Sequence, residues 1–196
     1  MAIRVLLWDF GDTMVDERWM LAPMVGVPAW QEAYTRVLRQ GDFADRWNLG
    51  AISTQDVAAN VGKVLGILPA LVRSHMEECS RKVVFFQRVL ELTNQCKLPQ
   101  AIVTVNPDIF TEIVVPTFQL DRRFSTIITS WECRNSRKAD LCDVARARLD
   151  RSLRRDECLL IDNKLENVSD WCDRGGVSFH FHSEDDMSPI RERLRH

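Results

Sequence analysis

Residues 3–18, IRVLLWDFGDTMVDER, contain a short apolar run that ends abruptly on an aspartate. The run at residues 3–8 is too short for a helix and is bounded by polar residues, which predicts a buried β-strand. Asp9 follows the run at once, and Asp12 lies three residues later with Gly11 between them. An aspartate in this position is either a turn former or a nucleophile at a strand end, and the rest of the chain decides between the two.

Four more apolar segments have the length and bounds of buried strands: residues 101–104, 126–129, 158–161 and 177–181. Helical patterns separate or follow them at residues 108–118, 139–149, 165–176 and 188–195. Alternating strands and helices are typical of an α/β fold, in which a parallel sheet lies between two layers of helices. The sequence therefore predicts a Rossmann-like three-layer core.

The interval between the first two predicted strands is much longer than a crossover requires. Residues 16–98 are helical in character throughout and contain no convincing strand, whereas a crossover needs only about a dozen residues. Such a long interval indicates an inserted subdomain. We predict a core domain of residues 1–15 and 99–196, with a helical cap subdomain of residues 16–98.

Composition limits the partners and the compartment. The 196 residues carry a formal net charge of −2, so there is no basic footprint for nucleic acid. No apolar run is long enough to span a bilayer, and the N-terminus lacks a signal-peptide pattern. The six cysteines form no C-x-x-C pair and have no histidine at zinc spacing, which favours reduced cysteines in the cytoplasm. We expect a monomer or homodimer with neither nucleic acid nor a membrane as a partner.

The residues at the predicted strand ends have the chemistry of a phosphoryl site. Ligands of open α/β sheets bind at the carboxyl ends of the strands, and the residues there are Asp9, Thr104, Lys138 and Asp162. Each has an ordinary structural role when taken alone, as a turn former, strand residue, surface lysine or helix cap. Together, two carboxylates, a hydroxyl and a lysine suit a phosphoryl group bound with Mg²⁺.

This ordered set resembles the haloacid dehalogenase (HAD) superfamily of hydrolases. The family pattern is a strand ending in D-x-D-x-T, a strand ending in Ser or Thr, a lysine, and a strand ending in an acidic motif. The corresponding stretches of this chain are LLWDFGDTMV at 6–15, AIVTVN at 101–106, SRKAD at 136–140 and LLIDNKLENV at 159–168. Each motif is weak alone, but the four in this order cover nearly the whole chain.

The resemblance implies a role for each matching residue. Asp9 is expected to form a covalent aspartyl intermediate, Thr104 to hydrogen-bond the transferring group, and Lys138 to steady the nucleophile and the substrate charge. Asp9, Asp162 and the backbone carbonyl of Gly11 are expected to hold Mg²⁺. The family's sheet order places the second and fourth strands on either side of the first, so Thr104 and Asp162 should flank Asp9.

The chain departs from the family pattern at the residue that handles protons. Phosphatases of the superfamily usually carry a second aspartate two residues after the nucleophile, where this chain has Gly11. A positioned general acid/base is worth roughly 100- to 10,000-fold in rate, so we expect a slow enzyme or one that acts on good leaving groups. Asp12 either substitutes through an unusual turn or is only a turn former. Asn163 stands where a second acid is common and reduces the charge available to a metal.

Three functions follow from these observations. The leading hypothesis is a Mg²⁺-dependent phosphatase that acts on a small phosphorylated metabolite. A haloacid dehalogenase is the second, because enzymes of that type also lack the second aspartate and need no metal. A phosphoryl-binding protein with little catalysis is the third. The apolar stretch WMLAPMVGVPAW at 19–30 either lines the entrance to the site or packs the cap against the core.

Overall fold

Five parallel strands form a single sheet at the centre of the structure, a computed structural model that describes residues 2–182 and 188–193. The strands are β1 (Val5–Trp8), β2 (Gln100–Thr104), β3 (Thr126–Thr129), β4 (Cys158–Asp162) and β5 (Val177–His180), in the spatial order β3-β2-β1-β4-β5. Every residue of β1, β2 and β4 is buried. The predicted α/β fold with a parallel sheet is confirmed.

The register of the sheet brings the strand ends to one edge. Trp8, the last residue of β1, lies opposite Ile102 of β2 and Ile161 of β4. The chain continues in register past Trp8, because the Asp9 N–H donates to the Ile161 carbonyl at 2.9 Å. Asp9 therefore lies between the ends of β2 and β4, which is the arrangement that the resemblance implied.

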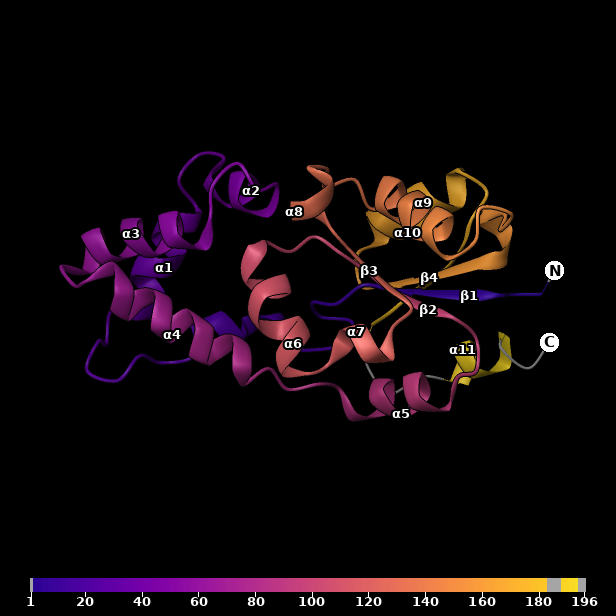
Figure 1. Cartoon of the computed structure of the whole chain (residues 1–196), viewed down its shortest axis with the longest axis horizontal. Coiled ribbons are helices and arrows are strands. Elements are labelled where there is room, and N and C mark those ends of the chain that lie inside the picture. The colour runs from indigo at the N-terminus through magenta and orange to yellow at the C-terminus, as the bar shows by residue number, and fades with distance from the viewer. Residues whose placement is uncertain (1, 183–187, 194–196) are drawn as a thin grey trace.

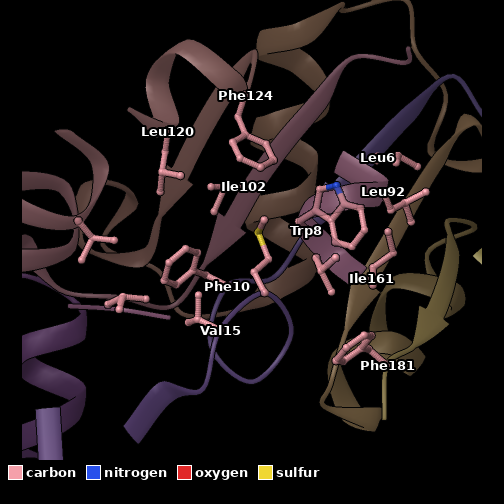
Figure 2. Packing of buried hydrophobic residues seen from close by; sticks show 14 of the residues in the cluster. Leu6, Trp8, Phe10, Val15, Leu92, Ile102, Leu120, Phe124, Ile161 and Phe181 are labelled. Atoms are coloured by element: carbon pink, nitrogen blue, oxygen red, sulfur yellow. The ribbon is translucent and has the colours of Figure 1, made fainter. Parts of the chain in front are cut away.

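Helices cover both faces of the sheet (Figure 1). One face carries α9 (Lys138–Leu149) and α10 (Leu165–Asp173), and the other carries α5 (Gln87–Gln95), α7 (Leu120–Arg123) and α11 (Ser188–Arg193). Alternate side chains of β1 serve the two faces, because successive residues of a strand point in opposite directions. Leu6 and Trp8 pack in the cluster that includes Leu92, shown in Figure 2, whereas Leu7 packs in the cluster under α9.

The predicted helix at 108–118 is irregular. It contains a π-helical turn at Phe110–Val114 followed by the short α6 (Val115–Thr117). Pro116 has no N–H to donate within the helix, so regular α-helical bonding cannot pass through it. Two further short elements, α8 (Ser130–Cys133) and the 3₁₀ helix Arg155–Glu157, follow β3 and precede β4. The last predicted helix, at 188–195, is described only as far as Arg193, and residues 194–195 lie outside the described part.

A helical cap follows β1 and has a hydrophobic cluster of its own. Its elements are a 3₁₀ helix (Glu17–Leu21), α1 (Trp30–Leu38), α2 (Phe43–Asn48), α3 (Thr54–Leu65) and α4 (Pro69–Arg81). A capping box between Ser53 and Asp56 starts α3, and left-handed Gly66 ends it. Figure 1 shows these helices at the end of the molecule remote from both termini.

The helix α5 lies within the predicted cap interval but packs on the sheet. Its Val89 and Leu92 belong to the cluster that contains Leu6 and Trp8. The predicted cap of residues 16–98 therefore includes one helix of the core layer, and the helices that pack among themselves end with α4. Periodicity alone identifies α5 as a helix, but it does not say which apolar surface the helix covers.

Two general expectations can be compared with the structure. All six cysteines are free, three of them buried, two half-buried and Cys172 exposed. Among the described residues, no single helix is long and apolar enough to cross a membrane; α3 and α4 pass that test only as a pair, and the pair is bent by 117°.

Candidate active site

Asp9 and Lys138 form a buried ion pair at the carboxyl end of β1. The Lys138 ammonium donates to Asp9 Oδ1 at 2.5 Å and to the Val103 carbonyl at 2.8 Å, and it lies 3.2 Å from Asp162 Oδ2. Asp9 is 7% exposed and Lys138 3%, although isolated lysines are seldom buried. Lys138 is the first residue of α9, so the start of this helix delivers the cation to the gap between two carboxylates.

Burial and charge act in opposite directions on this pair. Burial raises the pKa of Asp9, the Lys138 ammonium lowers it and Asp162 raises it, with a net upward shift. Burial lowers the pKa of Lys138, but the carboxylates of Asp9 and Asp162 raise it by more. The lysine therefore remains a cation, and it is the charge that permits a buried carboxylate at position 9.

The two oxygens of Asp9 have different environments. Oδ1 accepts from Lys138 at 2.5 Å, whereas the Thr13 hydroxyl lies 3.5 Å from Oδ2. The same hydroxyl accepts from the Asn163 N–H at 3.1 Å and lies 3.5 Å from Asn163 Oδ1. The more weakly bound oxygen of Asp9 thus faces Thr13 and Asn163, away from Lys138.

Asp162 is fully buried and well supplied with donors. Its Oδ1 accepts from the Lys164 N–H at 2.8 Å, and the Asn167 amide lies 3.0 Å from both of its oxygens. Asp162 Oδ2 also faces Lys138. The Asp162 carboxylate therefore holds the Lys138 ammonium in place, and the start of α10 holds the Asp162 carboxylate through Lys164 and Asn167.

Thr104 lies at the end of β2 and is 1% exposed. Its Oγ1 accepts from the Asn106 amide at 2.7 Å. Since one lone pair of the oxygen is taken by this bond, the hydroxyl hydrogen is left to donate toward a ligand. Thr104 and Asn106 both line the small cavity over Asp9.

Asp12 forms the turn after the strand. Its backbone is left-handed, with φ of 52°, and its N–H donates to the Val15 carbonyl at 2.7 Å. Its carboxylate Oδ1 accepts from the Glu17 N–H at 3.0 Å. Asp12 does not line the cavity over Asp9, so of the two roles weighed for it, the structure gives it that of a turn former.

Two adjoining cavities lie between the sheet edge and the cap. The smaller, of about 60 Å³, is lined by residues that include Asp9, Gly11, Thr104, Lys138 and Lys164. The larger, of about 440 Å³, lies mostly among cap side chains. Four residues line both cavities: Glu17, Trp19, Val105 and Asn106.

Solved structures of other proteins share this architecture. A HAD family enzyme, bt-2542 from Bacteroides thetaiotaomicron, matches with a TM-score of 0.74 and 16% identity over 97% of this chain and 99% of that chain. A predicted HAD-like family hydrolase from Porphyromonas gingivalis matches with a TM-score of 0.77 and 13% identity over 100% and 98%. This chain has the HAD fold.

The solved structures that share this fold also include a dehalogenase and a complex with magnesium and phosphate. L-2-haloacid dehalogenase from Xanthobacter autotrophicus, with chloropropionic acid covalently bound, matches with a TM-score of 0.63 and 16% identity over 90% of this chain and 76% of that chain. The Bacteroides enzyme was also solved with magnesium and inorganic phosphate. No protein-family model and no curated protein matches the sequence.

Within the HAD fold, the residues around Asp9 fit a magnesium ion that is coordinated mainly by waters and the substrate phosphate, with few protein groups. The described residues contain no group of three or more His, Cys, Asp or Glu side chains that could hold a metal. Mg²⁺ commonly binds one or two carboxylates, several waters and the substrate phosphate. Asp9 offers one such carboxylate, and a phosphate beside Asp9 and Asp162 would bring more negative charge than Lys138 offsets.

Sequence reasoning assigned no role to four polar residues of the site. Asn106 supports Thr104, Asn167 supports Asp162, and Lys164 and Glu17 line the small cavity. Asn106, Lys164 and Asn167 lie within the quoted motif stretches, so their place beside a predicted site residue was the available signal. Glu17 had no such signal, because its place depends on how the chain folds back after Asp12.

Proposed function

We propose that the protein is a Mg²⁺-dependent phosphatase, a HAD-like hydrolase that acts on a small phosphorylated metabolite through an aspartyl-phosphate intermediate. The observation that carries the proposal is the buried Lys138 ammonium between the Asp9 and Asp162 carboxylates, beside a cavity at the sheet edge. Such a pair is costly to bury, and the arrangement suits an anionic ligand that arrives at Asp9.

We propose Asp9 Oδ2 as the attacking atom. Lys138 binds Oδ1, which orients the carboxylate and leaves Oδ2 to attack phosphorus. The Thr104 hydroxyl donates to a phosphoryl oxygen, and the Lys138 and Lys164 ammonium groups offset phosphate charge. When bound, Mg²⁺ would add to this neutralisation, held by Asp9 and the Gly11 carbonyl. A role for Asp162 as a further metal ligand remains a prediction, since its oxygens already accept from Lys138, Lys164 and Asn167.

The larger cavity suggests where the rest of the substrate lies. Its walls include the side chains of Trp19, Tyr34, Leu38, Trp47 and Arg39. We propose a substrate whose phosphate binds at Asp9 and whose body is partly apolar. Trp19, Met20 and Leu21 of the apolar stretch at 19–30 also line this cavity, in keeping with the alternative that this stretch lines the entrance. A monomer or homodimer in the cytoplasm, with neither nucleic acid nor a membrane as a partner, remains part of the proposal.

Haloacid dehalogenase chemistry is the second candidate. Gly11 brings no carboxylate to the site, and a halide leaves without a proton. The Asp9–Lys138 pair would serve this reaction too, since attack of a carboxylate on carbon needs the same oriented nucleophile.

One series of assays separates the candidates. Wild type and Asp9→Asn are incubated with para-nitrophenyl phosphate, with and without Mg²⁺, and with 2-chloropropionate. We expect phosphate release that needs Mg²⁺ and is lost in Asp9→Asn, while Asp16→Asn, which alters a carboxylate paired with Arg18, keeps the activity. Chloride release without metal would support the dehalogenase instead. Turnover of neither compound would leave the phosphoryl-binding protein.

A further inference from the structure

Glu17 lies where the two cavities meet. Of the four residues that line both, Trp19, Val105 and Asn106 have no side-chain group that exchanges a proton near neutral pH, whereas Glu17 has a carboxyl group. If phosphate fills the smaller cavity at Asp9 and the substrate body fills the larger, the oxygen that joins them lies at this junction. Glu17 therefore faces the bond that the reaction breaks.

Gly11 makes room for the Glu17 carboxyl. A Cβ atom at position 11 would lie 2.7 Å from Glu17 Oε2, closer than real Cβ contacts, and 3.1 Å from Glu17 Cβ, tighter than most of them, so the Glu17 side chain would have to move. The Glu17 side chain thus lies directly over Gly11, in the space that a side chain at position 11 would occupy. The Glu17 carboxyl group can take this position because residue 11 has no side chain.

The turn after β1 carries Glu17 to this place. Left-handed Asp12 reverses the chain, its N–H donates to the Val15 carbonyl, and Gly11 forms a bridge with Val15. Asp12 Oδ1 then accepts from the Glu17 N–H at 3.0 Å. Asp12 is thereby a positioning residue for the first residue of the 3₁₀ helix, which explains a carboxylate at position 12 that does not line the cavity.

We infer that Glu17 is the general acid and base of the reaction, a role that rests on the proposed phosphatase function. As Asp9 Oδ2 bonds to phosphorus, the bond from phosphorus to the leaving oxygen breaks, and that oxygen takes the proton of the Glu17 carboxyl to give an alcohol. The Glu17 carboxylate then takes a proton from a water that attacks the aspartyl phosphate. The bond between phosphorus and Asp9 breaks, inorganic phosphate leaves, and both carboxyl groups return to their starting states.

Glu17→Gln tests this role because the two half-reactions differ in their need for Glu17. With para-nitrophenyl phosphate, the leaving group needs no proton, so the first step proceeds and the second stalls. We expect a burst of nitrophenolate equal to the enzyme concentration, followed by turnover slowed roughly 100-fold or more, and a phosphoryl group added in the intact mass. With phenethyl phosphate, whose alkoxide is a poor leaving group, we expect a similar loss without a burst.

A rescue experiment distinguishes chemistry from loss of fold. Glu17→Ala should lose activity, and adding Gly11→Asp should restore at least a tenth of it, because removal of Glu17 clears the space that a side chain at position 11 needs. Asp16→Asn is the matched control on the same turn, since the Asp16 carboxylate binds Arg18 and lines neither cavity.

The outcomes separate this inference from the function on which it rests. If wild type turns over para-nitrophenyl phosphate in an Asp9-dependent way and Glu17→Gln stays within threefold of it on both substrates, the role of Glu17 is overturned and the phosphatase stands. If Glu17→Gln is slow but shows neither a burst nor rescue by Gly11→Asp in the Glu17→Ala background, Glu17 is structural and the inference is again overturned. If wild type has no Asp9-dependent phosphatase activity, both proposals fail together.

Discussion

At the residue scale, the Lys138 ammonium offsets the charge of the buried Asp9 carboxylate. The Lys138 ammonium touches Asp9 and Asp162, and the Val103 carbonyl takes another of its hydrogens. Removing one partner of such a group leaves a buried charge uncompensated, which typically costs about 3–5 kcal/mol. The residues to which we assign the chemistry are therefore also buried charges whose cost the rest of the fold must offset.

The cost of burying Asp9 predicts a pH-dependent effect of Asp9→Asn. The pKa of Asp9 is raised in the folded state, chiefly by burial, so above about pH 3.9 the folded chain holds this proton more tightly than the unfolded chain. The contribution of Asp9 to stability thus falls as pH rises through the folded pKa. Asparagine cannot titrate, so the free energy of unfolding of Asp9→Asn relative to wild type should increase as the pH rises from about 4 toward neutral.

Urea denaturation of both proteins across this range measures the difference. Asp16→Asn is the control, because its hydrogen bond from Arg18 lowers the pKa of Asp16 to about 2. Its effect on stability should change only below the ordinary pKa of aspartate and stay level above about pH 4. A level difference for Asp9→Asn over the same range would contradict the assigned environment.

At the scale of elements, one set of contacts ties α9 to α10 and another ties the cap to the core. Arg137 binds Asp170 with two hydrogen bonds, and Arg174 binds Asp140, so α9 and α10 are tied together where they deliver Lys138 and support Asp162. Exposed pairs of this kind contribute little energy each. A buried group, Asp108, ties the cap to the core.

Asp108 should be needed for an ordered cap. It is 4% exposed and accepts from Trp47 Nε1, from the Thr54 N–H and from the Thr54 hydroxyl. Asp108→Ala would remove this acceptor from the Thr54 N–H and hydroxyl, and would leave Trp47 Nε1 with the Thr54 hydroxyl oxygen at 3.2 Å. Hydrogen bonds to charged groups are worth about 1.5–3 kcal/mol. We expect the free energy of unfolding to fall by about 2–3 kcal/mol, with faster hydrogen exchange at residues 47–57.

Asp108→Asn is the matched variant, since it keeps an acceptor oxygen at the same place and should lose less stability. Equal exchange rates in the cap of Asp108→Ala and wild type would show that other contacts suffice. One such contact is the Ser130 hydroxyl, which donates to the Asn48 carbonyl at 2.7 Å.

At the scale of the whole molecule, the site is shared between two hydrophobic units. The sheet has a cluster on each face, the cap has a third, and the cavities lie where cap and sheet edge meet. A ligand bound there contacts both units and stabilises them together, because it binds the folded chain in preference to the unfolded one.

Orthovanadate with Mg²⁺, as a phosphate analogue, should therefore raise the melting temperature. A ligand at a hundred times its Kd adds about 2.7 kcal/mol, which corresponds to a rise of about 5–10 °C for a chain of this size. Differential scanning fluorimetry measures the rise, and we expect Lys138→Met, which lacks the cation, to lose it. A rise with 2-chloropropionate in place of vanadate would favour the dehalogenase.

The sequence by itself determined the α/β fold with its parallel sheet, and it predicted a helical insertion and four site residues. Short buried strands are continuous apolar runs, and a parallel sheet brings their carboxyl ends to one edge, so Asp9, Thr104 and Asp162 could be placed from order alone. Lys138 followed from the motif order, not from periodicity. The strands depend on residues that are neighbours along the chain, and the common edge of their carboxyl ends follows from the parallel sheet.

Only the tertiary structure decided the assignment of α5 to the core, the anchoring role of Asp108 and the place of Glu17. Each depends on a contact between segments that no local pattern encodes: Val89 and Leu92 against Leu6 and Trp8, or Asp108 against Thr54. Glu17 is near Gly11 in sequence, yet it lies over it only because left-handed Asp12 turns the chain back. A backbone turn, set by φ at one residue, thus places the carboxyl group that the first motif lacks.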